Sequence, residues 1–315
     1  MEEHRARILI TAPWFTDKYL NTLRKHFIVD TNKMERWYTE DELSKIISDY
    51  DGIIAGLDPF TENVLKKARN LKIIARRGIG VDNIDLEYCS KKNIIVTNTP
   101  IDIEHRAVAE FALGLILDAT RNITRSCISL KSGSWKRADF LGKSLEELTV
   151  GILGFGNTGH ALAKLLQKIG VKVIYYDPYV NDDQFMKVTL EDLFSNSDVV
   201  SINAPLTAET RKLVDDRILS MMKEGSYLIN VSRGEIIDYK ALLKHIRSGH
   251  ISSVATDVYD IEPPTNMEFI LNDRVVCTPH IAAFAEDAFD EIDRICTENL
   301  INLLIYGKEP SYIIG

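Results

Sequence analysis

Three glycines, Gly154, Gly156 and Gly159, lie where an apolar run gives way to a helical pattern, and they constrain the fold more than any other feature of the chain. Residues 149–153 are predicted to be a buried strand, and residues 161–169 repeat apolar positions at helical spacing. Glycines between a strand and a helix allow a tight turn, let a pyrophosphate approach the backbone, and let the helix pack closely on the strand. The pattern predicts a dinucleotide-binding unit of a parallel sheet.

An acidic residue narrows the choice of dinucleotide. Residues 171–176 are predicted to be the next strand, and Asp177 follows it at the spacing at which a carboxylate binds the adenosine ribose hydroxyls. Because its charge repels a 2′-phosphate, the pattern predicts NAD and not NADP. A glycine-rich turn without a ligand is the competing interpretation. The strand before the turn, the helix after it and the acid at the end of the next strand all favour a dinucleotide site instead. The predicted contacts are Asp177 and the turn residues Gly154, Phe155, Gly156, Asn157, Thr158 and Gly159.

Length and composition limit the number of domains, the possible binding partners and the cellular location. At 315 residues the chain exceeds the ~250–300 residues at which single cores stop growing, so two domains are expected. The formal charge of -8 and the pI of about 5.5 exclude a basic surface for nucleic acid or anionic membranes. The four cysteines form no CxxC pair, which predicts reduced thiols in a cytoplasmic protein and no metal site. No apolar run approaches the ~18 residues of a membrane span.

Alternating strand and helix patterns predict an α/β fold with two doubly wound parallel sheets. One sheet is expected in a Rossmann NAD-binding domain and the other in a discontinuous flavodoxin-like substrate domain. A linking helix is expected from residue 107, and a last helix, 286–305, is expected to return to the first domain. The predicted division is residues 1–100 for the substrate domain, 101–282 for the NAD-binding domain, and 283–315 for the returning helix. Further strands are predicted at 7–11, 52–55, 72–75, 93–97, 199–202, 227–231, 251–255 and 275–277, and helices at 40–48, 216–222 and 239–248.

Three polar residues follow successive predicted strands at the carboxyl edge of the second sheet. They are Arg233, Glu262 and His280. Oxidation of a hydroxyl beside a carboxylate needs a cation for the carboxylate, a proton carrier for the oxygen and a hydride acceptor. Arg233, His280 and NAD supply these functions, and Glu262 orients the histidine. Taken singly, each residue also has a structural interpretation: a surface arginine, a solvated glutamate and a histidine that caps the last helix.

A second glycine-rich turn, ARRGIGVDNID at residues 75–85, follows a strand in the first domain. Backbone amides at Gly78, Ile79 and Gly80 are placed to bind an anionic group, the substrate carboxylate. A tight structural turn explains the same spacing equally well. Arg76, in the same turn, is the candidate side chain for substrate binding.

The motifs ARRGIGVDNID, VAEFALGLIL, GILGFGNTGH, NAPLTAET, NVSRGEIID, DVYDIEPP and TPHIA occur in the order typical of the D-isomer-specific 2-hydroxyacid dehydrogenases. The chain resembles their phosphoglycerate dehydrogenase and glyoxylate/hydroxypyruvate reductase branch along nearly its whole length. The resemblance implies that Arg233, Glu262 and His280 are catalytic, that Gly78–Gly80 and Arg233 bind substrate, and that the family's usual homodimer forms through the helix from Ala107 and residues 132–140. It also implies that the cofactor contacts Pro205, Thr207, Val231, Ser232, Arg233, Asp257 and His280.

The resemblance leaves the substrate open. The segment NTPIDIEHRAVAE is one residue longer than the family spacing and lacks its usual asparagine. Arg76, Arg77 and Arg137 supply positive charge for a phosphorylated substrate, which slightly favours 3-phosphoglycerate over glyoxylate or hydroxypyruvate. The alternative function is an NADH-sensing binding protein of the corepressor type on the same fold. The short ends of the chain, without basic tails, favour an enzyme, and formate or phosphite dehydrogenase has no special support.

Overall fold

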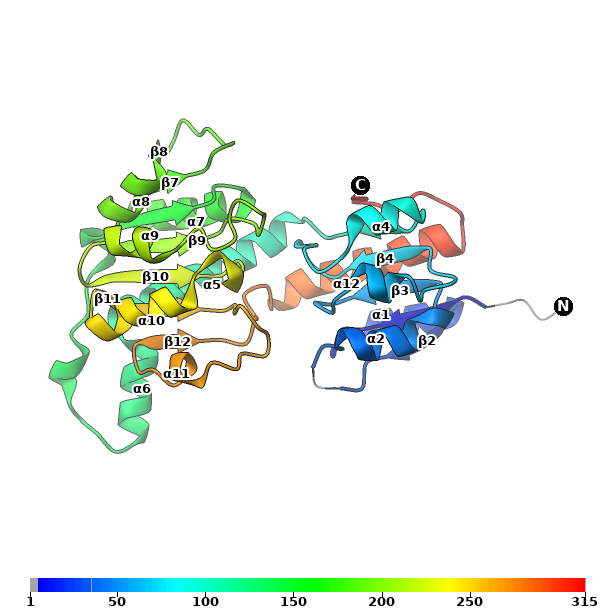
Figure 1. Ribbon diagram of the computed structural model, residues 1–315, viewed down its shortest axis with the longest axis horizontal. Coiled ribbons are helices and arrows are strands. Elements are labelled where there is room, and N and C mark those ends of the chain that lie inside the picture. The colour runs from blue at the N-terminus through cyan, green and yellow to red at the C-terminus, as the bar shows by residue number, and fades with distance from the viewer. Residues whose placement is uncertain (1–4, 35, 315) are drawn as a thin grey trace. The chain divides into compact units, whose positions relative to one another are not determined.

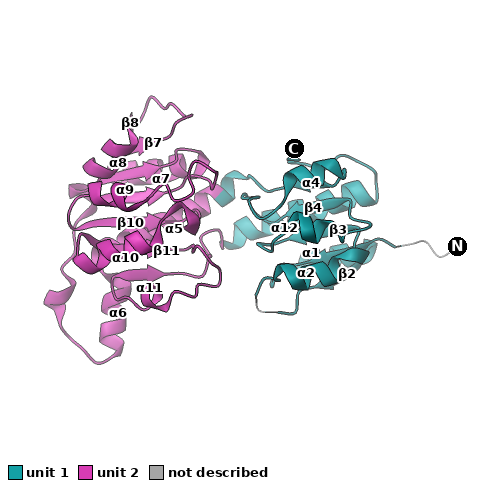
Figure 2. Ribbon diagram, in the orientation of Figure 1, with its two compact units in different colours: residues 1–104, 285–315 teal, residues 105–284 magenta. Residues whose placement is uncertain are grey.

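The computed structural model describes residues 5–34 and 36–314, which form two compact units (Figure 1). One unit contains residues 1–104 and 285–315, and the other contains residues 105–284 (Figure 2). The chain therefore passes between units at 104/105 and 284/285, where the sequence analysis placed the boundaries at 100/101 and 282/283. The first unit is discontinuous because helix α12 (Glu286–Leu304) packs on its sheet and on α1.

The first unit is built on a five-stranded parallel sheet with the strand order β2-β1-β3-β4-β5. Its cores lie on both faces: Ile8 and Ile10 pack with α1 and α12, whereas Leu9 between them packs with α2, α3 and α4. A strand covered on both faces is apolar throughout, as in other parallel sheets. The elements are β1 (Arg7–Ile10), α1 (Asp17–His26), β2 (Ile28–Thr31), α2 (Glu40–Ile46), β3 (Gly52–Ala55), α3 (Glu62–Leu65), β4 (Ile73–Arg76), α4 (Leu86–Lys91) and β5 (Ile95–Thr97).

The second unit is built on a seven-stranded parallel sheet with the order β12-β11-β10-β9-β6-β7-β8. Helices α5 and α7 cover one face, and α8, α9 and α10 cover the other. The elements are α5 (Asp102–Arg121), which begins in the first unit, and then α6 (Ile123–Lys131), β6 (Thr149–Leu153), α7 (Asn157–Lys168), β7 (Lys172–Tyr176), β8 (Met186–Lys187), α8 (Leu190–Asn196), β9 (Val199–Ile202), α9 (Asp216–Met221), β10 (Ser226–Asn230), α10 (Tyr239–Ser248), β11 (Ile251–Thr256), α11 (Met267–Ile270) and β12 (Val275–Cys277).

The order in which the chain adds strands reverses between β6 and β9: from β6 it continues to β7 and β8 on one side, and from β9 it continues to β10, β11 and β12 on the other. In open α/β sheets, ligands bind at the carboxyl ends of the strands where the order reverses. The glycine-rich turn after β6 and the loop after β9 lie at this point. The fold thus places the dinucleotide motif at the edge where a ligand site is expected.

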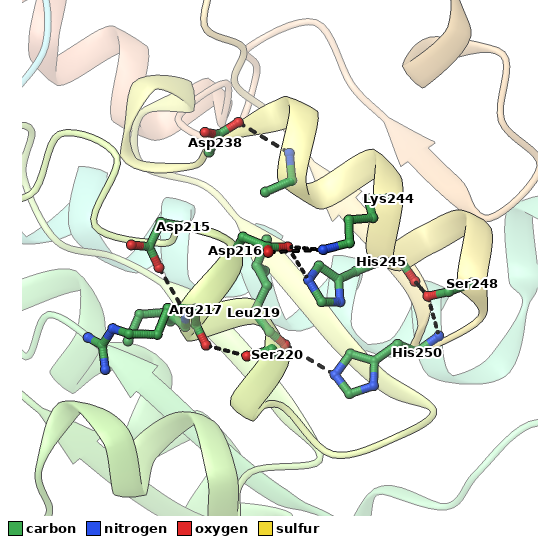
Figure 3. Close-up of polar contacts among 12 residues, drawn as sticks. Asp215, Asp216, Arg217, Leu219, Ser220, Asp238, Lys244, His245, Ser248 and His250 are labelled. Atoms are coloured by element: carbon green, nitrogen blue, oxygen red, sulfur yellow. Dashed lines mark hydrogen bonds and ion pairs between the residues drawn. The ribbon is translucent and has the colours of Figure 1, made fainter.

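Helices α9 and α10 pack together on the outside of the second sheet. Figure 3 shows the polar contacts that join them, in which Asp216 lies 2.9 Å from both Nζ of Lys244 and Nε2 of His245. The Asp238 side chain accepts hydrogen bonds from the first amides of α10, and Gly249 ends the helix with a φ of 80°. These contacts stabilise the helix that follows the Arg233 turn.

Several expected boundaries were wrong. Helix α5 begins at Asp102 and not at residue 107, because its first turn is polar and the apolar repeat begins one turn later. Acidic residues in that turn, Asp102 and Glu104, suit a helix N-terminus and were an overlooked signal. Strand β2 is partly exposed at the edge of its sheet, and β8 has only two residues, so neither has a strong apolar pattern. Helix α6 was not expected either, and it has no buried residue.

Within residues 5–34 and 36–314, no helix combines the length with the apolar character that a transmembrane span requires.

Candidate active site

The glycine-rich turn after β6 is shaped to receive a ligand. Gly154 has a φ of 87°, and a Cβ at this position would lie 2.5 Å from the backbone of Ala204, so only glycine fits. A Cβ on Gly156 would meet no atom within 4 Å, which leaves open space in front of the turn. Gly156 is also the N-cap of α7 and has no side chain to cap it. An uncapped helix N-terminus beside open space is a geometry that suits an anionic group.

Asp177 lies directly after β7 and organises the same turn. Its carboxylate accepts hydrogen bonds from the amides of Phe155 at 2.8 Å, Tyr179 at 2.8 Å and Val180 at 3.0 Å. Burial acts to raise the pKa of Asp177, but these three amides outweigh burial and lower it. Asp177 is thus a carboxylate at neutral pH, and it fixes the position of Phe155 within the fingerprint.

The loops after β9 and β10 border the glycine turn. The hydroxyl of Ser232 donates to the carbonyl of Ala204, the residue that contacts Gly154. Thr210 braces the loop, since its Oγ1 donates to the carbonyl of Pro205 and accepts from the amide of Thr207, both at 2.7 Å. The structure therefore brings the predicted cofactor positions in the fingerprint, at 205–207 and at 231–232 to the same edge of the sheet.

Arg233 lies in the turn after β10. Its carbonyl accepts from Nδ2 of Asn230 at 2.9 Å, and its Nη1 donates to the carbonyl of Ser232 at 2.8 Å. A Cβ on the next residue, Gly234, would collide with the backbone of Tyr259 and Asp260. This close approach brings the arginine turn against the loop that bears Glu262.

The side chains of His280 and Glu262 contact each other across the ends of β11 and β12. Nδ1 of His280 lies 2.7 Å from Oε2 of Glu262, and the other carboxylate oxygen accepts from the amide of Tyr259 at 3.0 Å. Both side chains are about one-quarter exposed, at 27% and 24%. The contact uses Nδ1, so Nε2 is the ring nitrogen left for proton exchange. His280 does not cap the last helix, whose N-cap is Ala285.

Asp257 anchors the segment that carries His280. Its carboxylate is fully buried and accepts from Oγ1 of Thr278 at 2.6 Å and from the amides of Ile281 at 2.9 Å and Ala282 at 2.7 Å. Burial raises the pKa of Asp257, and these three hydrogen bonds oppose the rise. The sequence pointed to Asp257 as a cofactor residue but did not predict this anchoring.

The glycine turn of the first unit is held from several sides. Gly78 has a φ of 138°, its carbonyl accepts from the amide of Thr99 at 3.2 Å, and the carbonyl of Ile79 accepts from Nδ2 of Asn98 at 2.8 Å. A Cβ on Gly78 would lie 2.8 Å from Nη1 of Arg76, so the buried Arg76 side chain packs directly against the turn. Gly80 follows at a half-buried position.

The neighbouring Arg77 is committed to a structural contact. Its guanidinium pairs with the buried carboxylate of Asp293 on α12, with Nε 2.5 Å from Oδ1, and lies 4.3 Å from the centre of the Phe289 ring. Both charged side chains are nearly inaccessible. Arg77 is therefore not available to a substrate phosphate, whereas Arg137 is exposed in the second unit.

Glu104 is a buried acid that the sequence analysis missed. It is 4% exposed, and it accepts a hydrogen bond from Oγ1 of Thr99 at 3.2 Å and another from the amide of Ile79. Burial raises its pKa from the ordinary 4.5 to about 7, against the opposing effect of Arg76. A carboxyl group that titrates near neutrality thus contacts the predicted substrate turn. Glu104 lies in the segment NTPIDIEHRAVAE, and the extra residue of that segment was the available signal.

Comparison with protein families gives a match over the second unit. The model described as the NAD binding domain of the D-isomer specific 2-hydroxyacid dehydrogenases matches residues 113–282. The match spans the glycine fingerprint, Asp177, Arg233, Glu262 and His280.

Named relatives and a solved structure match most of the chain. The chain is 40% identical over 255 residues to the hydroxypyruvate reductase of Thermotoga maritima, which covers 79% of this chain and 83% of that protein. It is 37% identical over 305 residues to the D-3-phosphoglycerate dehydrogenase of Methanocaldococcus jannaschii, covering 95% of this chain but 57% of the relative. The crystal structure of the TT0316 protein from Thermus thermophilus matches with a TM-score of 0.90 at 31% identity, covering 98% of this chain and 100% of that one.

Proposed function

This chain belongs to the D-isomer specific 2-hydroxyacid dehydrogenase family and is an NAD-dependent oxidoreductase, and from this premise we propose that it reduces a small 2-oxo acid to the D-2-hydroxy acid. The observation that carries the proposal is the 2.7 Å pairing of His280 with Glu262 beside the Arg233 turn. The imidazole, the carboxylate that contacts its Nδ1, and the Arg233 turn lie at the edge of the sheet that bears the dinucleotide motif, which supports the proposal.

The open space at Gly156 and the uncapped first turn of α7 fit the pyrophosphate of NAD. Asp177 is the residue that would hold the adenosine ribose. When bound, the cofactor supplies the hydride that passes to or from the substrate carbon. The chain supplies binding and proton transfer, because none of its own side chains carries a hydride.

His280 is proposed as the general acid in reduction and the general base in oxidation. Glu262 binds Nδ1 and so presents Nε2 to the substrate oxygen, and its charge stabilises the protonated ring. Arg233 is proposed to bind the substrate carboxylate through its guanidinium, whose paired donors match a carboxylate. In the first unit, the amides of Gly78, Ile79 and Gly80 and the side chain of Arg76 are proposed as further substrate contacts.

The proposed substrate class is unphosphorylated, such as hydroxypyruvate or glyoxylate. The preference for 3-phosphoglycerate depended on Arg76, Arg77 and Arg137, and Arg77 is bound to Asp293. A turn with one fewer available arginine is less suited to a dianionic phosphate. The relationship to the Thermotoga maritima hydroxypyruvate reductase, which this chain covers to 83%, supports the same choice.

A homodimer is proposed from the surface of the second unit. Large apolar side chains on α6 and the following segment are exposed: Ile123, Ile128, Leu130, Trp135 and Leu141. A soluble protein rarely exposes such a cluster unless another surface covers it. A second copy of the chain is the proposed cover, and the molar mass in solution tests it. The four free cysteines agree with the proposed cytoplasmic location.

A substrate panel tests the proposed activity. Purified protein is assayed with NADH or NADPH and hydroxypyruvate, glyoxylate or 3-phosphohydroxypyruvate. We expect NADH-dependent reduction, with kcat/KM at least about tenfold higher for an unphosphorylated acid. A preference for the phosphorylated acid would overturn the substrate class. NADH-tightened dimerisation without turnover of any acid would support the sensor function instead.

A further inference from the structure

A buried histidine outside the proposed catalytic residues contacts the dinucleotide turn. His105, in the first turn of α5, is 7% exposed. Its Nδ1 lies 3.0 Å from Oγ1 of Thr158, and its Nε2 lies 3.1 Å from Nδ2 of Asn157. Asn157 and Thr158 are the first two residues of α7, the helix that begins at the glycine fingerprint. One imidazole therefore contacts the side chains of the first two residues of this helix.

The two contacts indicate which ring nitrogen of His105 donates a hydrogen bond and which accepts one. The amide nitrogen of Asn157 can only donate, so Nε2 of His105 accepts. With Nε2 as the acceptor, the tautomer that satisfies both contacts has N–H at Nδ1, which donates a hydrogen bond to Oγ1 of Thr158. Both nitrogens of the imidazole are satisfied within the protein.

Asn and Thr near a helix start tend to bond nearby backbone amides. Here the N-cap is Gly156, which has no side chain, and the first turn of α7 has no side-chain cap. Asn157 and Thr158 are the nearest polar side chains along the chain that could turn back onto these amides. Because both side chains contact the imidazole of His105, they are directed toward that ring and not toward the amides of α7.

We infer that His105 is a positioning residue for the dinucleotide. By binding the side chains of Asn157 and Thr158, it keeps the first amides of α7 available for the pyrophosphate. The inference rests on the proposed cofactor site and adds to it a residue that acts through two others. It predicts a specific effect on NADH affinity with little effect on the chemical step.

Three substitutions separate the hydrogen bonds from the packing of the ring. H105F keeps an aromatic ring but removes both contacts, H105N places an amide near the position of Nδ1, and H105Q places one near the position of Nε2. The dissociation constant of NADH is measured by fluorescence titration without substrate, and kcat is measured at saturating NADH. We expect H105F to weaken NADH binding roughly tenfold, and H105N and H105Q to recover part of the loss. The kcat of all three is expected to stay within about twofold of the parent protein.

The matched control is H245F. His245 is also a buried histidine of the second unit, but its partner is Asp216 on α9 (Figure 3). Thermal unfolding of each variant reports any general loss of stability, and H245F is expected to leave the NADH affinity unchanged. NADH affinity in H105F equal to the parent value, or an equal loss in H245F, would overturn the role of His105. A parent protein that does not bind NADH would instead overturn the cofactor site itself.

Discussion

Nδ1 of His280 lies 2.7 Å from Oε2 of Glu262, so the carboxylate leaves Nε2 as the ring nitrogen for the proposed proton exchange with the substrate. Replacing Glu262 with Gln keeps the size of the side chain but removes the negative charge beside Nδ1 of His280. We expect E262Q to lower kcat by about 10- to 100-fold, with the NADH dissociation constant nearly unchanged. Steady-state kinetics and NADH titration of the same preparation check this. A kcat equal to that of the parent protein would remove Glu262 from the proposed role.

Asp257 accepts three hydrogen bonds from the segment 278–282, and we expect it to hold His280 in place. D257N puts an amide donor where one of these three donors now binds, which is expected to cost about 1–3 kcal/mol of the free energy of unfolding. Displacement of the imidazole should also lower kcat by at least about tenfold. Chemical denaturation and kinetics measure the two effects. D216N is the control, because Asp216 binds Lys244 and His245 on α10 and not the segment 278–282, and the kcat of this variant should not change.

The raised pKa of Glu104 is expected to make the free energy of unfolding depend on pH. Burial raises its pKa from 4.5 to about 7, so the folded protein keeps a proton that the unfolded chain releases between these values. The free energy of unfolding should therefore fall as the pH rises from about 4.5 to 7, by up to about 3 kcal/mol, and should then show no further change from this group. E104Q does not titrate, so we expect it to lose this slope and to be more stable than the parent at pH 8.

The control for Glu104 is E110Q, a substitution of an exposed glutamate on the same helix. Denaturation of the three proteins at several pH values between about 4.5 and 8 gives the comparison. E110Q should keep the slope of the parent protein. The same slope in E104Q would show that another group causes the pH dependence.

Asp177 is expected to set the preference between NAD and NADP. D177N keeps an oxygen that can accept backbone hydrogen bonds but removes the charge that repels a 2′-phosphate. The ratio of kcat/KM for NADH to that for NADPH should fall at least about tenfold. D182N, which neutralises a neighbouring acid in the same loop, should leave the ratio unchanged. An unchanged ratio in D177N would mean that other residues select the cofactor.

Local patterns were sufficient to predict the α/β class, the parallel sheets and the strand ends that carry the candidate residues. Strands of the second sheet are apolar because helices cover both faces, as the packing of β6 shows: Val150 and Ile152 face α7, and Leu153 faces the other side. The fingerprint was recognisable for a related reason, since the Gly154 conformation excludes other residues. Each of these signals lies within a few consecutive residues.

Contacts between distant segments could not be predicted in this way. The roles of Asp257, Glu104 and His105 depend on partners that the fold brings together, such as Asp257 with residue 282 and His105 with residue 158. Nothing in the spacing of a single carboxylate or imidazole specifies such a partner. For the same reason Arg77 was counted as available positive charge, although Asp293, far along the chain, neutralises it.

The most direct test of the proposed chemistry is a paired measurement on H280A. The dissociation constant of NADH and the kcat for reduction of hydroxypyruvate, or of the best 2-oxo acid found, are determined on the same preparation. The account predicts an NADH affinity close to that of the parent protein and a kcat lower by about 10²- to 10⁴-fold. A variant that binds NADH and reduces the substrate at the parent rate would contradict the assignment of His280 as the proton carrier.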